Sequence, residues 1–170
     1  MKPQALSSLK LDELDLRILD VLQVDAALSN VDLAQRAHAS EATCLRRVRA
    51  LVEQGVIEKR VAIVSPQALG NSLTAIVEVT LNEQHAERLN AFEALLVKEA
   101  AVSQCYRVSP GPDFVLMIIV SDMPGYHALA QRLFTAQHHV RQVRVYFSIK
   151  RGKFETRMPI VPMALTSSSP

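Results

Sequence analysis

Residues 29–55 read SNVDLAQRAHASEATCLRRVRALVEQG and predict two helices joined by a tight turn. Ser29, followed by Asp32 three positions later, is typical of a helix N-terminus, because a serine side chain can accept a backbone N–H of the first turn. After the turn, a longer helix is expected over residues 41–54, and Gly55 is expected to end it. A short helix, a tight turn and a longer helix together predict a unit of the helix-turn-helix type.

A third helix is expected before this pair. Apolar side chains recur there at three-to-four spacing, the pattern of an amphipathic helix, at Leu11, Leu14, Ile18 and either Val21 or Leu22. Asp12 is the expected N-cap of this helix, and Asp15 occupies the matching capping-box position. After the longer helix the periodicity changes. Residues 57–64 alternate imperfectly and predict a strand, and residues 57–72 as a whole are expected to lead into a second domain.

Three arginines lie within four positions of the longer helix. On a helical wheel, Leu45, Val48 and Val52 are expected to pack inward. The arginines then fall on or beside the outer face, which favours DNA reading, because arginine can bind phosphates or pair with guanine in the major groove. The N-terminal part of such a helix is expected nearest the DNA. The expected DNA-contacting residues are Ser40, Glu41, Thr43, Arg46, Arg47, Arg49 and Ala50.

The charges are distributed unevenly along this first domain. The net charge of the chain is only +2, so affinity for DNA has to come from local clustering. Residues 12–32 contain six acids and one base, whereas residues 36–60 contain six bases and three acids. This asymmetry would present bases to DNA. The alternatives are that the arginine run is a solvated helix face, or that the helix serves only for packing or dimerisation.

The remaining chain predicts a second domain over residues 73–151, with strand, helix, strand, strand, helix and strand in that order. The strands are expected at residues 73–81, 102–109, 114–121 and 143–149, and the helices carry apolar stripes at Leu89, Phe92 and Leu96 and at Tyr126, Leu129 and Leu133. This order predicts a ferredoxin-like βαββαβ sandwich. Both helices of such a sandwich cover one sheet face. The bare face is expected to be a subunit interface, and it would carry Thr74, Ile76, Glu78, Arg144 and Tyr146.

The expected fold class is therefore α+β, with a winged-helix-like helix-turn-helix domain at residues 11–56 followed by the sandwich. Residues 1–10 and 152–170 are expected to be terminal tails, the second containing three prolines and three serines.

Residues 11–57, LDELDLRILDVLQVDAALSNVDLAQRAHASEATCLRRVRALVEQGVI, resemble the DNA-binding domain of the Lrp/AsnC (feast/famine) transcription regulators. The resemblance continues through IVSPQALG, VEVTLN, CYRVSPGPDFVL, VSDMPGY and VYFSIK, so it covers roughly residues 11–150. It implies a sequence-specific regulator that binds a roughly palindromic double-stranded DNA operator. It also implies homodimers formed through the sandwich domain, often assembled into octamers, and control by a small ligand, commonly an amino acid.

In that family the turn between the second and third sandwich strands contributes to an effector site between subunits. The matching stretch here is RVSPGPDFV, residues 107–115, which departs from the usual Gly-Asp-aromatic-Asp pattern at Pro110, Gly111 and Pro112. Two prolines remove two N–H donors and stiffen the loop. The turn can therefore bind a different ligand or serve only as a hairpin, and Asp113 as a turn cap is an open alternative. The effector residues that the resemblance implies are Arg107, Val108, Ser109, Gly111, Asp113, Met123, Tyr146, Phe147 and Ser148.

Other classes of function receive little support from the sequence. An enzyme would have to use the histidines, but His127 and His138, expected on one helix, would be about 16 Å apart at 1.5 Å per residue, too far to share a metal. No catalytic residue, metal site or cofactor is expected. A DNA-binding architectural protein without a ligand remains the main alternative. Two cysteines, no signal-peptide-like N-terminus and an apolar run of only residues 114–120 predict a cytoplasmic protein without a membrane partner.

Overall fold

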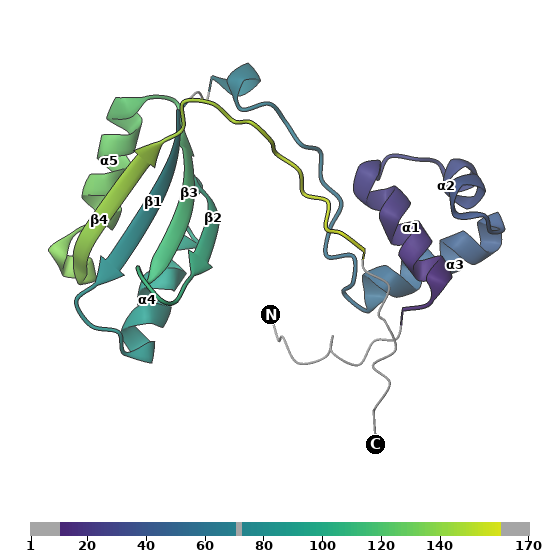
Figure 1. Cartoon of the computed structure of the whole chain (residues 1–170), viewed down its shortest axis with the longest axis horizontal. Coiled ribbons are helices and arrows are strands. Elements are labelled where there is room, and N and C mark those ends of the chain that lie inside the picture. Colours follow the sequence, from purple (N-terminus) through teal and green to yellow (C-terminus); the bar gives the residue numbers. More distant parts are fainter. Residues whose placement is uncertain (1–10, 71–72, 161–170) are drawn as a thin grey trace. The chain divides into compact units, whose positions relative to one another are not determined.

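The computed structural model describes residues 11–70 and 73–160, and it divides into two compact units. Among the described residues, the first unit contains residues 11–63 together with residues 153–160, and the second contains residues 64–152. Figure 1 shows the elements of both units. The expected N-terminal tail, residues 71–72 of the expected linker and the last ten residues of the expected C-terminal tail lie outside the described residues.

Three helices form the first unit: α1 (Glu13–Val24), α2 (Asn30–Ala37) and α3 (Glu41–Glu53). The expected capping box of α1 is confirmed, because Asp12 accepts the backbone N–H of Asp15 and Asp15 accepts that of Asp12. Ser29 caps α2 as expected by accepting the N–H of Asp32. Gly55 follows the C-cap of α3 with φ +75°, a left-handed conformation that glycine adopts without a Cβ clash.

The apolar contacts among these helices correct the expected inward face of α3. Cys44, Val48 and Leu51 are buried, whereas Leu45 and Val52 are exposed. Both sets of positions have helical spacing, so the spacing alone could not fix which side of α3 packs. The core that α3 joins consists of Ile18, Leu33, Ala34, Ala37, Cys44, Val48 and Leu51. The outer face of α3 is therefore rotated from the one expected.

The strand expected over residues 57–64 is not formed; this segment has no regular structure. A strand needs a hydrogen-bonded neighbour, and these residues have none within residues 11–70 and 73–160. Val61, Ile63 and Val64 are exposed there. A short 3-10 helix, η2 (Gln67–Leu69), follows.

Part of the expected C-terminal tail is held on the first unit. Arg157 Nη2 contacts Asp20 Oδ1 of α1 at 2.6 Å. The Gln23 side chain donates to the Met158 carbonyl at 3.1 Å and accepts the Met158 N–H at 2.7 Å. The last described residues therefore belong structurally to the helical unit, although they follow the second unit in sequence.

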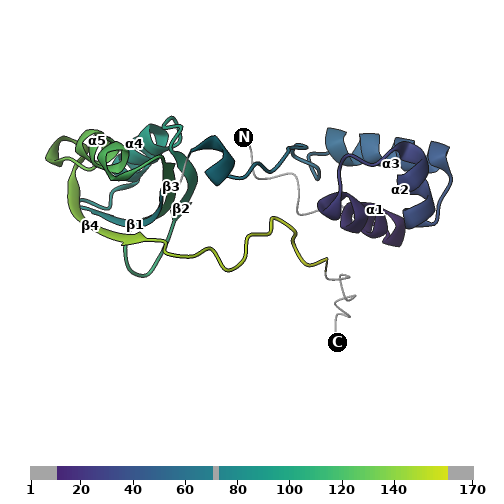
Figure 2. The ribbon, with the colours of Figure 1, turned by 90° about the horizontal axis from the view of Figure 1, so that it is seen from above.

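The second unit has the expected ferredoxin-like order of elements. It contains β1 (Leu73–Leu81), α4 (Ala86–Leu96), β2 (Val102–Arg107), β3 (Phe114–Val120), α5 (Met123–Leu133), η3 (Ala136–His138) and β4 (Val140–Phe147). The sheet order is β2-β3-β1-β4, and every neighbouring pair is antiparallel. Figure 2 shows α4 and α5 on the same face of this sheet.

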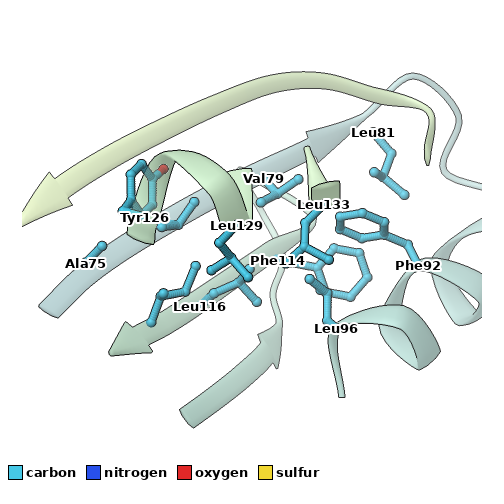
Figure 3. Packing of buried hydrophobic residues seen from close by; sticks show 12 residues of the cluster. Ala75, Val79, Leu81, Phe92, Leu96, Phe114, Leu116, Tyr126, Leu129 and Leu133 are labelled. Carbon is cyan, nitrogen blue, oxygen red and sulfur yellow. The ribbon is translucent and has the colours of Figure 1, made fainter. Parts of the chain in front are cut away.

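The core of the second unit lies between that face and the two helices (Figure 3). Strand β1 contributes its alternate residues Ala75, Val77, Val79 and Leu81, all buried. Phe92 of α4 packs against Phe114 of β3 with ring centroids 5.4 Å apart. The residues between the buried positions of β1 face the opposite side, as expected, so the sheet has an open face.

Two expectations about the end of this unit were wrong. The last strand ends at Phe147, not at residue 149, and Ile149 is fully exposed. His127 lies on α5 but His138 lies on η3, so the two histidines are not on one helix. Within residues 11–70 and 73–160, no cluster of His, Cys, Asp or Glu side chains is placed to hold a metal ion. None of the helices there is long and apolar enough to cross a membrane.

Candidate nucleic-acid interface and ligand-binding region

The exposed face of α3 is its most basic surface. Arg46 and Arg49 are exposed on it, and within the described part of the chain neither makes an ion pair or a side-chain hydrogen bond. Glu41 lies on the same exposed surface in the first turn. Two guanidinium groups without partners in that part of the chain can bind phosphate oxygens or the O6 and N7 atoms of guanine.

The start of α3 is fixed by hydrogen bonds that two expected DNA-contacting residues make. Ser40 Oγ accepts the Thr43 N–H at 3.3 Å and donates to Thr43 Oγ1 at 2.8 Å. Asn30 Nδ2 of α2 donates to the Glu41 carbonyl at 2.9 Å, which ties the two helices together across the turn. Ser40 and Thr43 therefore help to position the N-terminus of α3.

Arg47 differs from its two arginine neighbours. Its Nη2 lies 2.7 Å from Asp12 Oδ2, and its Nη1 lies 3.2 Å from Asp15 Oδ2. Asp15 is buried, with 6% exposure, and the Arg47 side chain is 29% exposed. The backbone N–H of Asp15, and then the Arg47 guanidinium, hold the pKa of the Asp12 carboxyl below its ordinary value. The structure thus places Arg47 in an ion-pair cluster with α1.

The seven residues expected to contact DNA therefore separate into two groups. Arg46, Arg49, Glu41 and Ser40 are exposed, whereas Thr43, Arg47 and Ala50 are partly buried. Sequence reasoning missed the exposed apolar side chains Leu45 and Val52 because it placed them in the core. Their exposure matters, because an apolar side chain on a groove-reading helix can contact a thymine methyl group.

The turn expected to contribute to an effector site is held firmly in place. Its Ser109–Pro110 peptide bond is cis, and Gly111 has φ +122°. Asp113 is 7% exposed, and its Oδ2 accepts the Leu81 N–H of β1 at 2.7 Å. The Asp113 N–H donates to the Val79 carbonyl at 2.9 Å. The Asp113 carboxylate therefore caps the backbone at the end of β1 and ties the turn to that strand, a structural role that differs from a cap within the turn itself.

Arg107 is directed toward helix α4. Its Nη2 donates to Asn90 Oδ1 at 2.9 Å and pairs with Glu93 Oε2 at 2.5 Å. Its guanidinium also lies 5.7 Å from the ring centroid of Phe114. These contacts place the Arg107 guanidinium on the helix-covered side of the sheet.

One chain does not bring the nine expected effector residues together. Met123 follows the end of β3, and Ser148 donates its N–H to Thr74 at the start of β1. That end of the sheet is about 20 Å from the turn before β3, because a strand rises about 3.3 Å per residue. Tyr146 and Phe147 face opposite sides of β4. The ring centroid of Phe147 lies 5.2 Å from that of Tyr126 on α5. A site that includes both the turn at residues 107–113 and the expected effector residues at the other end of the sheet needs more than one chain.

A hollow lies at the polar end of the open sheet face, where β1 ends and β4 begins. Its volume is about 250 Å³. The Arg144 Nη1 atom is 3.8 Å from Glu78 Oε2, a loose contact that leaves both groups able to bind something else. Arginine can hold a carboxylate and glutamate can hold an ammonium group. The lining residues are Glu78, Thr80, Gly111, Pro112, Arg141, Gln142 and Arg144.

Gly111 is among the expected effector residues and lines this hollow, whereas Arg141 and Gln142 were not expected at such a site. The sequence signal for Arg141 and Gln142 was weak, since both lie near the start of β4 and form no motif. Their proximity to the turn arises from sheet pairing, in which Gln142 lies opposite Thr80 and Arg144 opposite Glu78.

Two family models match the chain in order. Residues 11–58 match a winged helix-turn-helix DNA-binding domain. Residues 74–158 match the Lrp/AsnC ligand binding domain. The second match extends through Met158 and so includes the segment that contacts α1.

Similar proteins are transcription regulators. An uncharacterized HTH-type transcriptional regulator of Haemophilus influenzae is 41% identical over 86% of this chain and 87% of its own length. The leucine-responsive regulatory protein of Salmonella typhimurium is 35% identical over 88% of this chain and 92% of its own length.

Two solved structures have closely similar folds. An AsnC family transcriptional regulator of Agrobacterium tumefaciens has a TM-score of 0.82 and 32% identity, covering 88% of this chain and 97% of that one. A transcriptional regulator of Neisseria meningitidis in complex with L-Met has a TM-score of 0.82 and 28% identity over the same shares.

Proposed function

This chain belongs to the Lrp/AsnC family of DNA-binding transcription regulators, and from that premise we propose that it reads its operator through the exposed face of α3. It is a regulator with a ligand-binding domain and not an enzyme. The observation that carries the proposal is that Arg46 and Arg49 are exposed and have no partner within the described residues. Phosphate contacts of such arginines orient a recognition helix, and contacts to guanine give specificity.

The other proposed contacts lie around these two arginines. The exposed N-cap residue Ser40 and the neighbouring Glu41 are at the end of α3 that usually approaches the groove. Thr43 and Ala50 are partly buried at the edge of the face and make smaller contributions. Two such helices in a dimer bind half-sites about one DNA turn apart, so the operator is roughly palindromic.

The test is selection of duplexes from a random-sequence library, followed by fluorescence anisotropy on the enriched duplex and a scrambled one. We expect a palindromic consensus and a steep negative dependence of log K on log salt. The Arg46→Ala and Arg49→Ala variants should each lower the affinity, and a phosphate contact should also reduce the salt slope by about one. Equal affinity of all proteins for both duplexes would refute the proposed interface.

We also propose that the effector is an amino acid, bound where the turn at residues 109–113 meets the open sheet face. The Arg141 and Arg144 guanidiniums would hold its carboxylate, and Glu78 would hold its ammonium group. A related regulator binds L-Met, which supports an amino acid as the class of ligand. Thermal unfolding with each free amino acid tests this, because a ligand that binds only the folded state raises Tm with its concentration. The Arg141→Ala variant should lose that shift, and the Arg88→Ala variant, changed on α4, should keep it.

We further propose that the chain is a homodimer through the open sheet face, and that dimers assemble into octamers. The apolar part of that face carries Ile76, Met117 and Tyr146, and both Ile76 and Tyr146 are exposed. Ile76→Glu should reduce the mass measured by light scattering, whereas Val97→Glu, an exposed residue after α4, should leave it unchanged. As a DNA-binding regulator, the protein is proposed to act in the cytoplasm.

A further inference from the structure

We propose that Arg47 is a positioning residue that sets the orientation of α3 by clamping the capping box of α1, and that it does not contact DNA. This inference rests on the proposed DNA interface, because the residues that Arg47 orients are Arg46 and Arg49. Its basis is the ion-pair cluster of Arg47 with Asp12 and Asp15.

The two carboxylates are fixed before Arg47 reaches them. Asp12 Oδ1 accepts the Asp15 N–H at 2.9 Å, and Asp15 Oδ2 accepts the Asp12 N–H at 3.2 Å. Each aspartate is thus attached to the backbone of the first turn of α1. A guanidinium that contacts both carboxylates is located relative to the α1 backbone, and its planar shape allows few alternative arrangements.

Arg47 lies one residue from Arg46, which is about 100° around the helix at 3.6 residues per turn. When Arg47 is held toward α1, Arg46 and Arg49 are turned to the exposed side of α3. The buried apolar side chains fix which side of α3 packs, and the ion-pair cluster adds a directional contact between the Arg47 guanidinium and the first turn of α1. Loss of the cluster therefore lets α3 rotate or tilt and moves both exposed arginines away from their DNA contacts.

The competing interpretation is that Arg47 leaves the aspartates when DNA arrives. That movement would strand the buried carboxylate of Asp15 without its cation, which is costly. It would also expose two negative charges at the edge of a DNA-binding surface. Nε of Arg47 is buried and has no hydrogen-bond partner within the described residues, so this part of the side chain faces inward, although an unpaired buried N–H is itself unfavourable.

The two interpretations predict opposite effects when an aspartate is neutralised, and the full-length protein bound to the enriched duplex measures them. Asp12→Asn is the main variant, because asparagine is as good an N-cap as aspartate and only the charge is lost. Asp15→Asn is the second. Glu13→Gln is the matched control: it removes one negative charge from the same turn, at a side chain that is 95% exposed.

If Arg47 positions α3, Asp12→Asn and Asp15→Asn weaken operator binding relative to Glu13→Gln, by up to about tenfold, the scale of one lost base contact. Their preference for the operator over the scrambled duplex falls as well, at a temperature where circular dichroism shows every variant folded. If Arg47 contacts DNA, the same substitutions release it and strengthen binding at least as much as Glu13→Gln does. That result would overturn the proposal.

The arginines themselves provide a second readout. Arg47→Ala should weaken operator binding without changing the salt slope, whereas a phosphate-binding arginine should reduce that slope by about one. The double variant Asp12→Asn/Arg47→Ala should bind no more weakly than Arg47→Ala alone, because both substitutions break the same cluster. A reduced salt slope in Arg47→Ala, additive losses in the double variant, or a fall in Tm with an unchanged operator preference would each refute the positioning role.

Failure of the proposed function gives a different result. If the wild-type protein prefers no duplex, the interface on α3 and the role of Arg47 are both refuted. If the wild-type protein prefers its enriched duplex and only the aspartate variants behave contrary to expectation, the interface stands and the role of Arg47 falls.

Discussion

Replacement of Asp113 by alanine tests whether the turn before β3 is held by a structural cap. The substitution removes the carboxylate that accepts the Leu81 N–H at 2.7 Å, in a place where both residues are buried. A hydrogen bond to a charged group contributes about 1.5–3 kcal/mol, and its loss leaves the amide without a partner. We therefore expect the second unit of Asp113→Ala to be destabilised by about 2 kcal/mol.

Urea unfolding followed by circular dichroism is the appropriate assay, because the chain has no tryptophan to report by fluorescence. With a slope of about 2 kcal/mol per molar urea, a loss of about 2 kcal/mol lowers the midpoint by about 1 M. The two units can unfold separately, so the transition should be assigned by repeating the measurement on Leu51→Ala, which weakens the first unit.

Asp113→Asn is the control for chemistry at this position. The asparagine oxygen can still accept the Leu81 N–H, so we expect about half the loss seen for alanine. The rise in Tm caused by an amino-acid ligand should still occur in Asp113→Asn, because the Asp113 carboxylate contacts the β1 backbone and does not line the hollow on the open sheet face. Unchanged stability of Asp113→Ala, together with a lost ligand shift, would refute the assignment of this residue as a cap.

Three further predictions concern the first unit. Leu51→Ala should cost about 2–5 kcal/mol in the free energy of unfolding, and Leu45→Ala less than about 1 kcal/mol, because only Leu51 is buried; equal losses in urea unfolding would contradict the packing of α3. The lowered pKa of Asp12 gives stability that is present above its ordinary value of 3.8 and is lost as the pH falls through the lower folded-state pKa. Asp12→Asn should therefore reduce the pH dependence of unfolding below about pH 4, and an unchanged acid profile would argue against this linkage. Arg157→Ala should increase protease cleavage in residues 153–160, because its contact with Asp20 holds this segment, whereas equal cleavage rates would show that the contact is not formed in solution.

Local chemistry let the sequence predict most of the fold. The caps at Asp12 and Ser29 and the alternation of β1 depend on residues a few positions apart, and the structure has them as expected. The orientation of α3 could not be predicted in the same way, because two apolar stripes share Val48 and only contacts with the other helices decide between them. A strand over residues 57–64 would need a hydrogen-bonded neighbouring strand, and the spacing of apolar residues does not tell whether one is present.

The site was harder to predict than the fold, for a similar reason. The partners of Arg47 are 32 and 35 positions earlier in the chain, and the Leu81 amide that Asp113 caps is 32 positions away. Nothing in the residues beside them distinguishes an arginine that binds DNA from one that binds an aspartate. The same holds for a carboxylate that caps a turn and one that binds a ligand.

The return of the chain to α1 makes the helical unit discontinuous in sequence. In this respect the sheet unit is an insertion between two pieces of the helical unit, one ending near residue 63 and the other beginning near residue 153. A fragment that stops at residue 63 would lack the groups that bind Asp20 and Gln23, and so would not be the complete first unit. Conversely, a single cut between residues 58 and 64 would leave the contacts of Arg157 with Asp20 and of Met158 with Gln23 as the described links between the two pieces, and these contacts are few and exposed.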